Sequence, residues 1–312
     1  MAGILGQQSP ISDAGYGKSE GYTAFKQRCL YGVLQSHIAY CGALMDTRST
    51  SGVYSYFDLY GGPGIDNDFS FTGADQFGSP LQAVDTLYSC HVPYAAYVCE
   101  TNRDRHARLV DSLELFRYVN QSRADTLSSF YYTTTRERCP YDTVSIDMVR
   151  GRAVVARAPC ETAMPAMVDQ ALHRAKDGGS LGLIYADPNG IPPLKLLSDM
   201  ASAMPDVDVL VNFSATALKR NRSSVNGQWD MRELIGVINR TTCFIRQPVG
   251  KWQWTMLFFS NRDMPLPRGN RVDFRDVKSD VGRGWFDKAN YNTYMRGELR
   301  MVNGRSDVAT WG

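Results

Sequence analysis

The stretch that decides the fold is VYSYFDLYGGPG, residues 53–64. Its first part, residues 53–57, is rich in aromatic and β-branched residues and predicts a short buried strand. Its second part, residues 58–64, is a glycine-rich turn opened by Asp58. A buried strand that runs directly into such a turn is typical of the start of a doubly wound α/β sheet.

Composition places the chain among globular proteins and excludes several classes. Of its 312 residues, 43% are hydrophobic and 21% are charged, which excludes general disorder. The net charge of +2 argues against a strongly basic protein that wraps nucleic acid. No run of about 18 apolar residues predicts a membrane span. The first twelve residues lack the basic start and apolar core of a secretory signal.

The cysteines and histidines predict no metal centre. Seven cysteines occur without any C-x-x-C pair, which excludes zinc-ribbon and redox motifs. We therefore expect a reduced, cytoplasmic chain with buried structural thiols. His37, His91, His106 and His173 share no metal-ligand spacing, so we expect surface or hydrogen-bonded core histidines.

Apolar spacing divides the chain into four parts. Residues 1–21, which include five glycines, predict a flexible arm. Residues 22–50 predict a helical segment, with a helix over 22–45 that could break near Gly42. Residues 51–262 form the main α/β domain, and residues 263–312, rich in Arg, Asp, Gly and Asn, form an irregular cap on that domain.

Strands and helices alternate through the main domain. We expect further buried strands over 95–99, 180–186 and 207–213, and helices over 103–119, 161–176, 194–204 and 231–239. Residues 144–148 and 153–156 predict an inserted hairpin. Residues 243–247 and 252–259 predict an antiparallel hairpin at the end of the sheet.

Three of the predicted strands end in residues that suit a nucleoside-type ligand. Asp58 opens the glycine turn, Glu100 ends the second strand, and Asp187-Pro188-Asn189-Gly190 follows a third. Ligands of open α/β sheets bind outside the carboxyl ends of strands, so these residues would share one edge. The turn lacks the G-x-G-x-x-G spacing, so a dinucleotide fits poorly and a smaller ligand with an amino group fits better. Taken singly, each feature is also compatible with a plain turn or a solvated carboxylate.

The order of these motifs resembles class I S-adenosylmethionine-dependent methyltransferases, which have a Rossmann-like fold. Within them, the chain is most similar to the three-Cys-motif partner proteins. The resemblance covers about residues 22 to 260 and rests on short motifs: Lys26, Phe57–Gly64, Gly78–Leu81, Glu100 with Asn102, Asp187–Gly190, and Val211–Phe213 with Arg220.

The resemblance implies a cofactor site and a catalytic site. Asp58, Gly61, Gly62, Pro63 and Gly64 would line the methionine part of S-adenosylmethionine, and Glu100 would hold its ribose. The catalytic residues would be Asp187, Pro188 and Asn189, facing the methyl group and the substrate. Asn189 departs from the family, which usually has an aromatic residue there; Trp252 and Trp254 are candidate stacking partners. The third strand end, residues 157–160, also lacks the expected acid.

The function implied is methylation of a nucleobase amino group in DNA or RNA. We expect Ser79, Asn212, Lys219, Arg220 and Arg222 to contact the substrate. Arginines outnumber lysines 26 to 8, which suits phosphate contacts and equally a GC-rich genome. Further clusters at 103–108 and 262–275 fit nucleic acid or a solvated surface. Two alternatives remain: a non-catalytic nucleic-acid-binding partner protein, with a protein partner of its own, and another nucleotide-using, base-modifying transferase.

Overall fold

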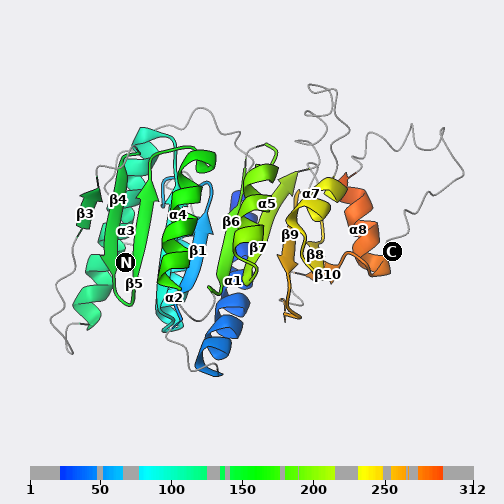
Figure 1. Ribbon diagram of the computed structural model, residues 1–312, viewed down its shortest axis with the longest axis horizontal. Coiled ribbons are helices and arrows are strands. Elements are labelled where there is room, and N and C mark those ends of the chain that lie inside the picture. The colour runs from blue at the N-terminus through cyan, green and yellow to red at the C-terminus, as the bar shows by residue number, and fades with distance from the viewer. Residues whose placement is uncertain are drawn as a thin grey trace, which may run out of the picture.

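The computed structural model describes residues 22–47, 52–65, 77–124, 134–137, 141–175, 180–188, 190–214, 231–248, 254–264, 266 and 273–290. These residues form one sheet of ten strands with helices on both faces (Figure 1). The strands are β1 (Tyr54–Asp58), β2 (Tyr94–Cys99), β3 (Thr134–Glu137), β4 (Thr143–Met148), β5 (Gly151–Ala156), β6 (Gly182–Ala186), β7 (Val207–Ser214), β8 (Thr242–Arg246), β9 (Trp254–Ser260) and β10 (Phe274–Asp276). The helices are α1 (Tyr22–Thr47), α2 (Ser79–Ser89), α3 (Arg103–Ala124), α4 (Cys160–Arg174), α5 (Leu194–Ala203), α7 (Met231–Ile238) and α8 (Asp280–Asn290).

The sheet confirms the predicted doubly wound, Rossmann-like fold. Its order is β10-β8-β9-β7-β6-β1-β2-β5-β4-β3, and the five central strands from β7 to β5 run parallel. The strand that opens the deciding stretch, β1, lies at the centre of this parallel set between β2 and β6. Strand β9 pairs antiparallel with both β7 and β8, as the predicted terminal hairpin requires.

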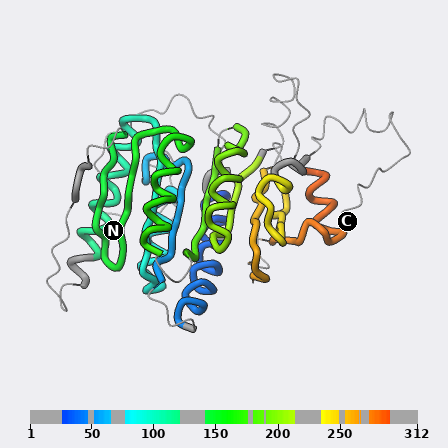
Figure 2. Tube along the Cα trace, viewed as in Figure 1, coloured from blue at the N-terminus to red at the C-terminus, as the bar shows by residue number. Residues whose placement is uncertain are grey.

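Each face of the sheet packs on its own layer of helices. All five residues of β1 are buried, because helices cover both of its faces. Phe57 points into a core shared with α4 and α5, whereas Tyr54 and Tyr56 point into a core shared with α1, α2 and α3. Figure 2 shows α4 and α5 in front of the sheet and α1 behind it.

Two regions differ from the expectations. The hairpin of β4 and β5 is not an insertion, because β5 pairs in parallel with β2 and β4 extends the sheet toward β3, a strand that the sequence pattern did not indicate. The cap is not wholly irregular, since it contains β10 and α8. Phe286 and Ala289 of α8 are buried against the sheet, at a helical spacing that the polar composition around them concealed. Helix α1 continues through Gly42 without a break.

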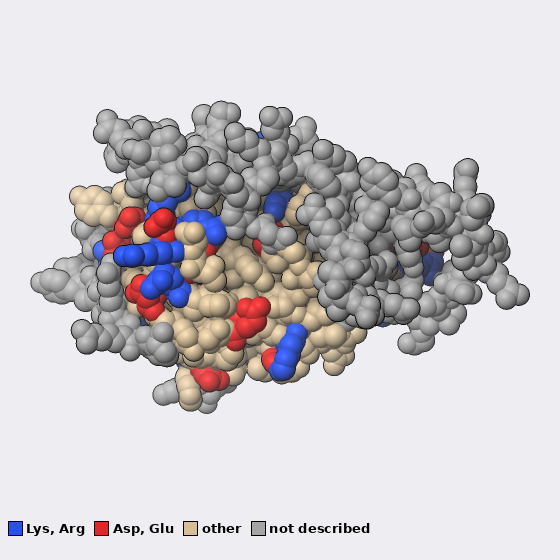
Figure 3. Space-filling model, turned by 90° about the horizontal axis from the view of Figure 1, so that it is seen from above, with Lys and Arg blue, Asp and Glu red and all other residues tan. Residues whose placement is uncertain are grey.

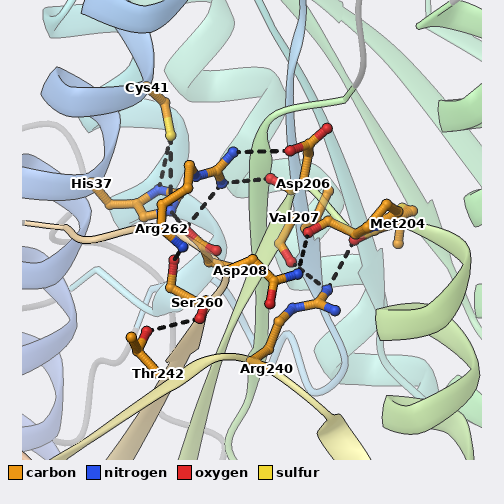
Figure 4. Close-up of polar contacts among 12 residues, drawn as sticks. His37, Cys41, Met204, Asp206, Val207, Asp208, Arg240, Thr242, Ser260 and Arg262 are labelled. Carbon is orange, nitrogen blue, oxygen red and sulfur yellow. Dashed lines mark hydrogen bonds and ion pairs between the residues drawn. The ribbon is translucent and has the colours of Figure 1, made fainter.

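A buried polar network fastens α1 to the sheet (Figure 4). The His37 ring lies 2.6 Å from the Tyr54 hydroxyl through Nδ1 and 3.0 Å from Asp208 Oδ2 through Nε2. Arg262 donates from Nη2 to the same Asp208 oxygen at 3.1 Å. The side chain of Cys41 lies 3.8 Å from both ring nitrogens. The network thus joins α1, β1, β7 and the end of β9 in one place.

The network keeps a charged histidine inside the protein. Burial works to lower the pKa of His37, but Cys41 and the carboxylate of Asp208 outweigh it and raise the pKa to about 9. The same contacts, with Arg262, lower the pKa of Asp208 against the effect of its own burial. His37 is therefore the hydrogen-bonded core histidine expected from the sequence. Its charge stabilises the fold fully below pH 6.5, and this contribution is lost as the pH rises through about 9.

We predict that Asp208→Asn lowers the free energy of unfolding at pH 7 by about 3–5 kcal/mol, because His37 and Arg262 lose a buried counter-charge. Urea denaturation measures this change. Asp199→Asn is the matched control, since Asp199 is exposed and pairs with Lys195 across one turn of α5. The fall in wild-type stability between pH 6.5 and 9 should also flatten in Asp208→Asn; equal effects of the two variants would contradict the assignment.

Candidate functional site

The carboxyl ends of three neighbouring strands bring the predicted acidic residues to one edge. Asp58 lies in register with Val98 of β2 and Tyr185 of β6. Glu100 and Asp187 each follow two residues later, so they flank Asp58 on either side. Figure 3, seen from above, looks onto this edge, where an area without charge adjoins a cluster of both signs.

The glycine turn after β1 is shaped by close packing at two of its positions and by backbone conformation at a third. A Cβ on Gly61 would lie 2.3 Å from the Val98 side chain, and its N–H donates to the Cys99 carbonyl at 2.8 Å. Gly62 has φ +64°, and no atom of the described residues lies within 4 Å of its missing side chain. Gly64, at φ +82°, packs on Leu109 of α3. Packing on Val98 and Leu109 therefore fixes the turn, whereas the described residues leave the side of Gly62 uncovered.

Asp58 is wholly buried beneath this turn. Its Oδ2 accepts from the Tyr56 hydroxyl at 3.0 Å, and its Oδ1 accepts from the Tyr60 N–H at 3.0 Å. Burial raises the pKa of Asp58 to about 6, although hydrogen bonds from Ser79, Tyr60 and Tyr56 lower it, and the charge of Asp187 raises it further. The Asp58 carboxylate therefore ties the turn to the start of α2, where Ser79 is the first residue.

Glu100 is held at the end of β2 by its own neighbours. It is 7% exposed, and its Oε1 accepts from the Asn102 N–H at 2.7 Å and lies 3.6 Å from Arg105 Nε. Both contacts use Oε1; one comes from Asn102, just before α3, and the other from Arg105 in its first turn. The carboxylate is thus oriented by one oxygen, a geometry that suits an acceptor of hydroxyl groups through the other.

Asp187 is the most heavily bonded side chain at this edge. Lys26 donates to both of its oxygens, at 3.0 and 2.8 Å, and Asn212 Nδ2 donates to Oδ1 at 2.5 Å. The Tyr185 hydroxyl also bonds to it. Because Pro188, which follows, is buried, the end of β6 is a rigid support for this carboxylate. The group remains 22% exposed and can still meet a ligand.

Lys26 and Trp254 complete this part of the edge. The ammonium of Lys26 lies 4.8 Å from the centre of the Trp254 ring, a cation–π geometry, while it bonds to Asp187. Trp254 is half-buried, and its Nε1 has no hydrogen-bond partner among the described residues. The sequence named Lys26 only within the family resemblance and gave it no role. Its position could not be read from spacing, since Lys26 and Asp187 are 161 residues apart.

The remaining predicted residues fall into two groups. Asn212 and Ser79 lie at the edge, where they bond to Asp187 and Asp58 respectively. Asn189, Lys219, Arg220, Arg222 and Trp252 lie outside the described residues. In the cluster at 103–108, Arg105 pairs with Glu100, and Arg108 donates to the Ile65 carbonyl at 3.3 Å. These two arginines therefore bond to the strand end and the turn that form the site.

Among the described residues, no group of three His, Cys, Asp or Glu side chains could hold a metal ion. The described cysteines are free thiols, all buried except Cys90. Among the helices that the structure describes, none is long and apolar enough to cross a membrane.

Comparison with known proteins finds only weak structural similarity at low sequence identity. A scan against protein-family models finds no match, and neither does a search of curated proteins. Among solved structures, a DUF519 protein of Legionella pneumophila aligns over 76% of this chain and 87% of its own at 12% identity and a TM-score of 0.42. A human methyltransferase 10 domain containing protein aligns over 74% of this chain and 83% of its own, at 10% identity and a TM-score of 0.34. The METTL16 methyltransferase domain aligns over 72% of this chain and 81% of its own, at 11% identity and a TM-score of 0.32.

We predict that Asp58→Asn changes how stability depends on pH. Since the pKa of Asp58 is about 6 in the folded protein and 3.8 without burial, its contribution to stability falls by about 2 kcal/mol between pH 4 and pH 7. Asparagine keeps the hydrogen-bond positions without the buried charge. Urea denaturation at pH 4.5 and 7.5 should show the variant gaining on the wild type at the higher pH. Parallel pH profiles would contradict the raised pKa.

Proposed function

We propose that the chain is an S-adenosylmethionine-dependent methyltransferase acting on a nucleobase amino group in DNA or RNA. The observation that carries the proposal is the oriented carboxylate of Asp187, held by Lys26, Asn212 and Tyr185 beside the glycine turn. The finer resemblance to three-Cys-motif partner proteins, with their site assignments, is part of this proposal.

The residues present fit the cofactor. Open space above Gly62 would admit the methionine part, with Gly61, Pro63 and Gly64 shaping the turn around it. Asp58 would act from below, by fixing the turn through Tyr60 and Ser79, since it is wholly buried. Glu100 would accept from the ribose hydroxyls. When bound, S-adenosylmethionine would supply an electrophilic methyl group.

The substrate would be oriented by the residues around Asp187. A neutral amine needs positioning more than acid–base assistance, so hydrogen-bond acceptors held rigidly at the strand end suffice. Asp187 would accept from the amino group, and Asn212 and Lys26 would fix the carboxylate. The exposed part of the Trp254 ring would stack on the base, in place of the aromatic residue that position 189 lacks. Asn189, Lys219, Arg220 and Arg222 would contact the substrate strand.

We predict that Glu100→Ala weakens affinity for S-adenosylmethionine at least tenfold, because charge-assisted bonds to two hydroxyls, about 1.5–3 kcal/mol each, are lost. Isothermal titration calorimetry measures the affinity. Asp111→Ala is the control, because Asp111 is an exposed carboxylate on α3, the helix that follows Glu100. A Glu100→Ala affinity within twofold of the wild type would leave Glu100 as a structural carboxylate.

We predict that Asp187→Asn lowers methyl transfer at least about 100-fold while cofactor affinity changes little, because Asp187 positions the amine. The assay is transfer of labelled methyl to DNA and RNA from a host that lacks the protein. Asp199→Asn is the control, since it removes a carboxylate remote from the edge. Full transfer by Asp187→Asn would place the chemistry elsewhere.

Two results of these assays would favour the alternatives. Cofactor binding without transfer to any nucleic acid would favour the non-catalytic partner protein. Another nucleotide carried through purification, identified by mass spectrometry, would favour a different base-modifying transferase.

A further inference from the structure

A cavity away from the acidic edge lies where the sheet extends past the helix that covers it. Helix α4 packs over β2, whereas α3 covers β4 and β5 on the opposite face. On the α4 side, β4 and β5 therefore form a shelf beside the helix. A cavity of about 290 Å³ opens there, lined by Ser145, Arg152, Val154, Gln170, His173 and Arg174.

The cavity is separate from the edge that holds Asp187. Strand β5 begins at Gly151 and α4 ends at Arg174, so Arg152 and Arg174 both lie toward the amino ends of the parallel strands. Helix α4 begins near the carboxyl edge, and at 1.5 Å per residue it spans roughly 22 Å. The proposed methyl transfer therefore makes no use of these residues.

Positive charge gathers around the cavity. Two guanidinium groups and the His173 imidazole line it. Asp147 accepts from Arg152 Nε at 2.8 Å, which orients this side chain, and among the described residues its terminal nitrogens have no acceptor. Arg152 remains 40% exposed despite this ion pair. Gln170 and Arg174 stand one turn apart on α4, so both can reach the same ligand.

A buried hydroxyl beside the cavity lacks a partner. Tyr97 of β2 is wholly buried, and its ring stacks on Phe57 with centroids 5.0 Å apart. Its hydroxyl makes no hydrogen bond to any described residue. Tyr97 pairs in parallel register with Val154 of β5, which lines the cavity, so the two side chains lie on the same face of the sheet. Burial raises the pKa of Tyr97, while the charges of Arg174 and Arg152 lower it. A buried donor without a partner destabilises the fold, and a ligand oxygen would remove this penalty.

We propose that this cavity binds a phosphoryl group. Arginine forks match phosphate oxygens with paired hydrogen bonds, and the Gln170 amide and the Ser145 and Tyr97 hydroxyls add neutral donors. A phosphoryl group offers enough oxygens for donors that approach from the shelf and from α4 together. The group belongs either to a nucleic-acid strand or to a small phosphate compound.

The test compares two variants of the full chain with a control. Arg152→Gln/Arg174→Gln removes both forks but keeps polar side chains. Tyr97→Phe removes only the buried hydroxyl and leaves all charges in place. Lys195→Gln is the control, because it removes an exposed cation on α5 outside the cavity. Circular dichroism and thermal unfolding verify that each variant is folded.

Two probes distinguish the sources of the phosphoryl group. Inorganic phosphate is titrated by calorimetry in phosphate-free buffer, and a labelled twelve-nucleotide single strand is titrated by fluorescence anisotropy over a salt series. We expect saturable phosphate binding that weakens at least tenfold in the double variant and several-fold in Tyr97→Phe. Lys195→Gln should stay within twofold of the wild type.

Each outcome decides the proposal. If the double variant binds the oligonucleotide more weakly, and the slope of log K against log salt concentration falls by about 1.4, the phosphoryl group belongs to a nucleic-acid strand. If only phosphate binding weakens, the cavity takes a small phosphate compound. If neither probe distinguishes the double variant from Lys195→Gln, the proposal is wrong.

Discussion

The buried carboxylate of Asp208 is the constraint on which the rest of the structure depends. It compensates the charges of two cations, His37 in α1 and Arg262 after β9, which are far apart in the sequence. If this carboxylate were lost, both charges would remain inside the protein at a cost of several kcal/mol. Because His37 fixes α1 against β1 and β7, the same contact determines where the first residues of α1 lie. Lys26 reaches Asp187 only from a helix docked in this way.

The parallel centre of the sheet and its acidic strand ends could be predicted from the sequence. Buried strands read as continuous apolar runs, and the residues that end them are next to them in the chain, so Asp58, Glu100 and Asp187 were found together. What spacing could not show is contact across long separations, such as Lys26 with Asp187 or His37 with Asp208. Strand β3 could not be predicted because its sequence, TTRE, contains no apolar residue, and helix α8 because its few apolar residues are set among polar ones.

The site combines a rigid turn with a held carboxylate. Below Gly62, Asp58 and its hydrogen bonds fix the backbone, while the space above remains open. Beside it, Asp187 is bonded by side chains from α1, β6 and β7, so three separate elements must be correctly placed before it is oriented. Its geometry thus depends on the whole central sheet rather than on one loop.

The place of β9 in the sheet also determines when the protein can fold during synthesis. Strand β9 pairs with β7, yet it is made about forty residues later, and Arg262 follows it. A nascent chain that ends before β9 therefore has an open edge at β7 and Asp208 without one of its counter-charges. The core around β7 is therefore completed only after β9 has been made, so its non-local pairing comes late in synthesis.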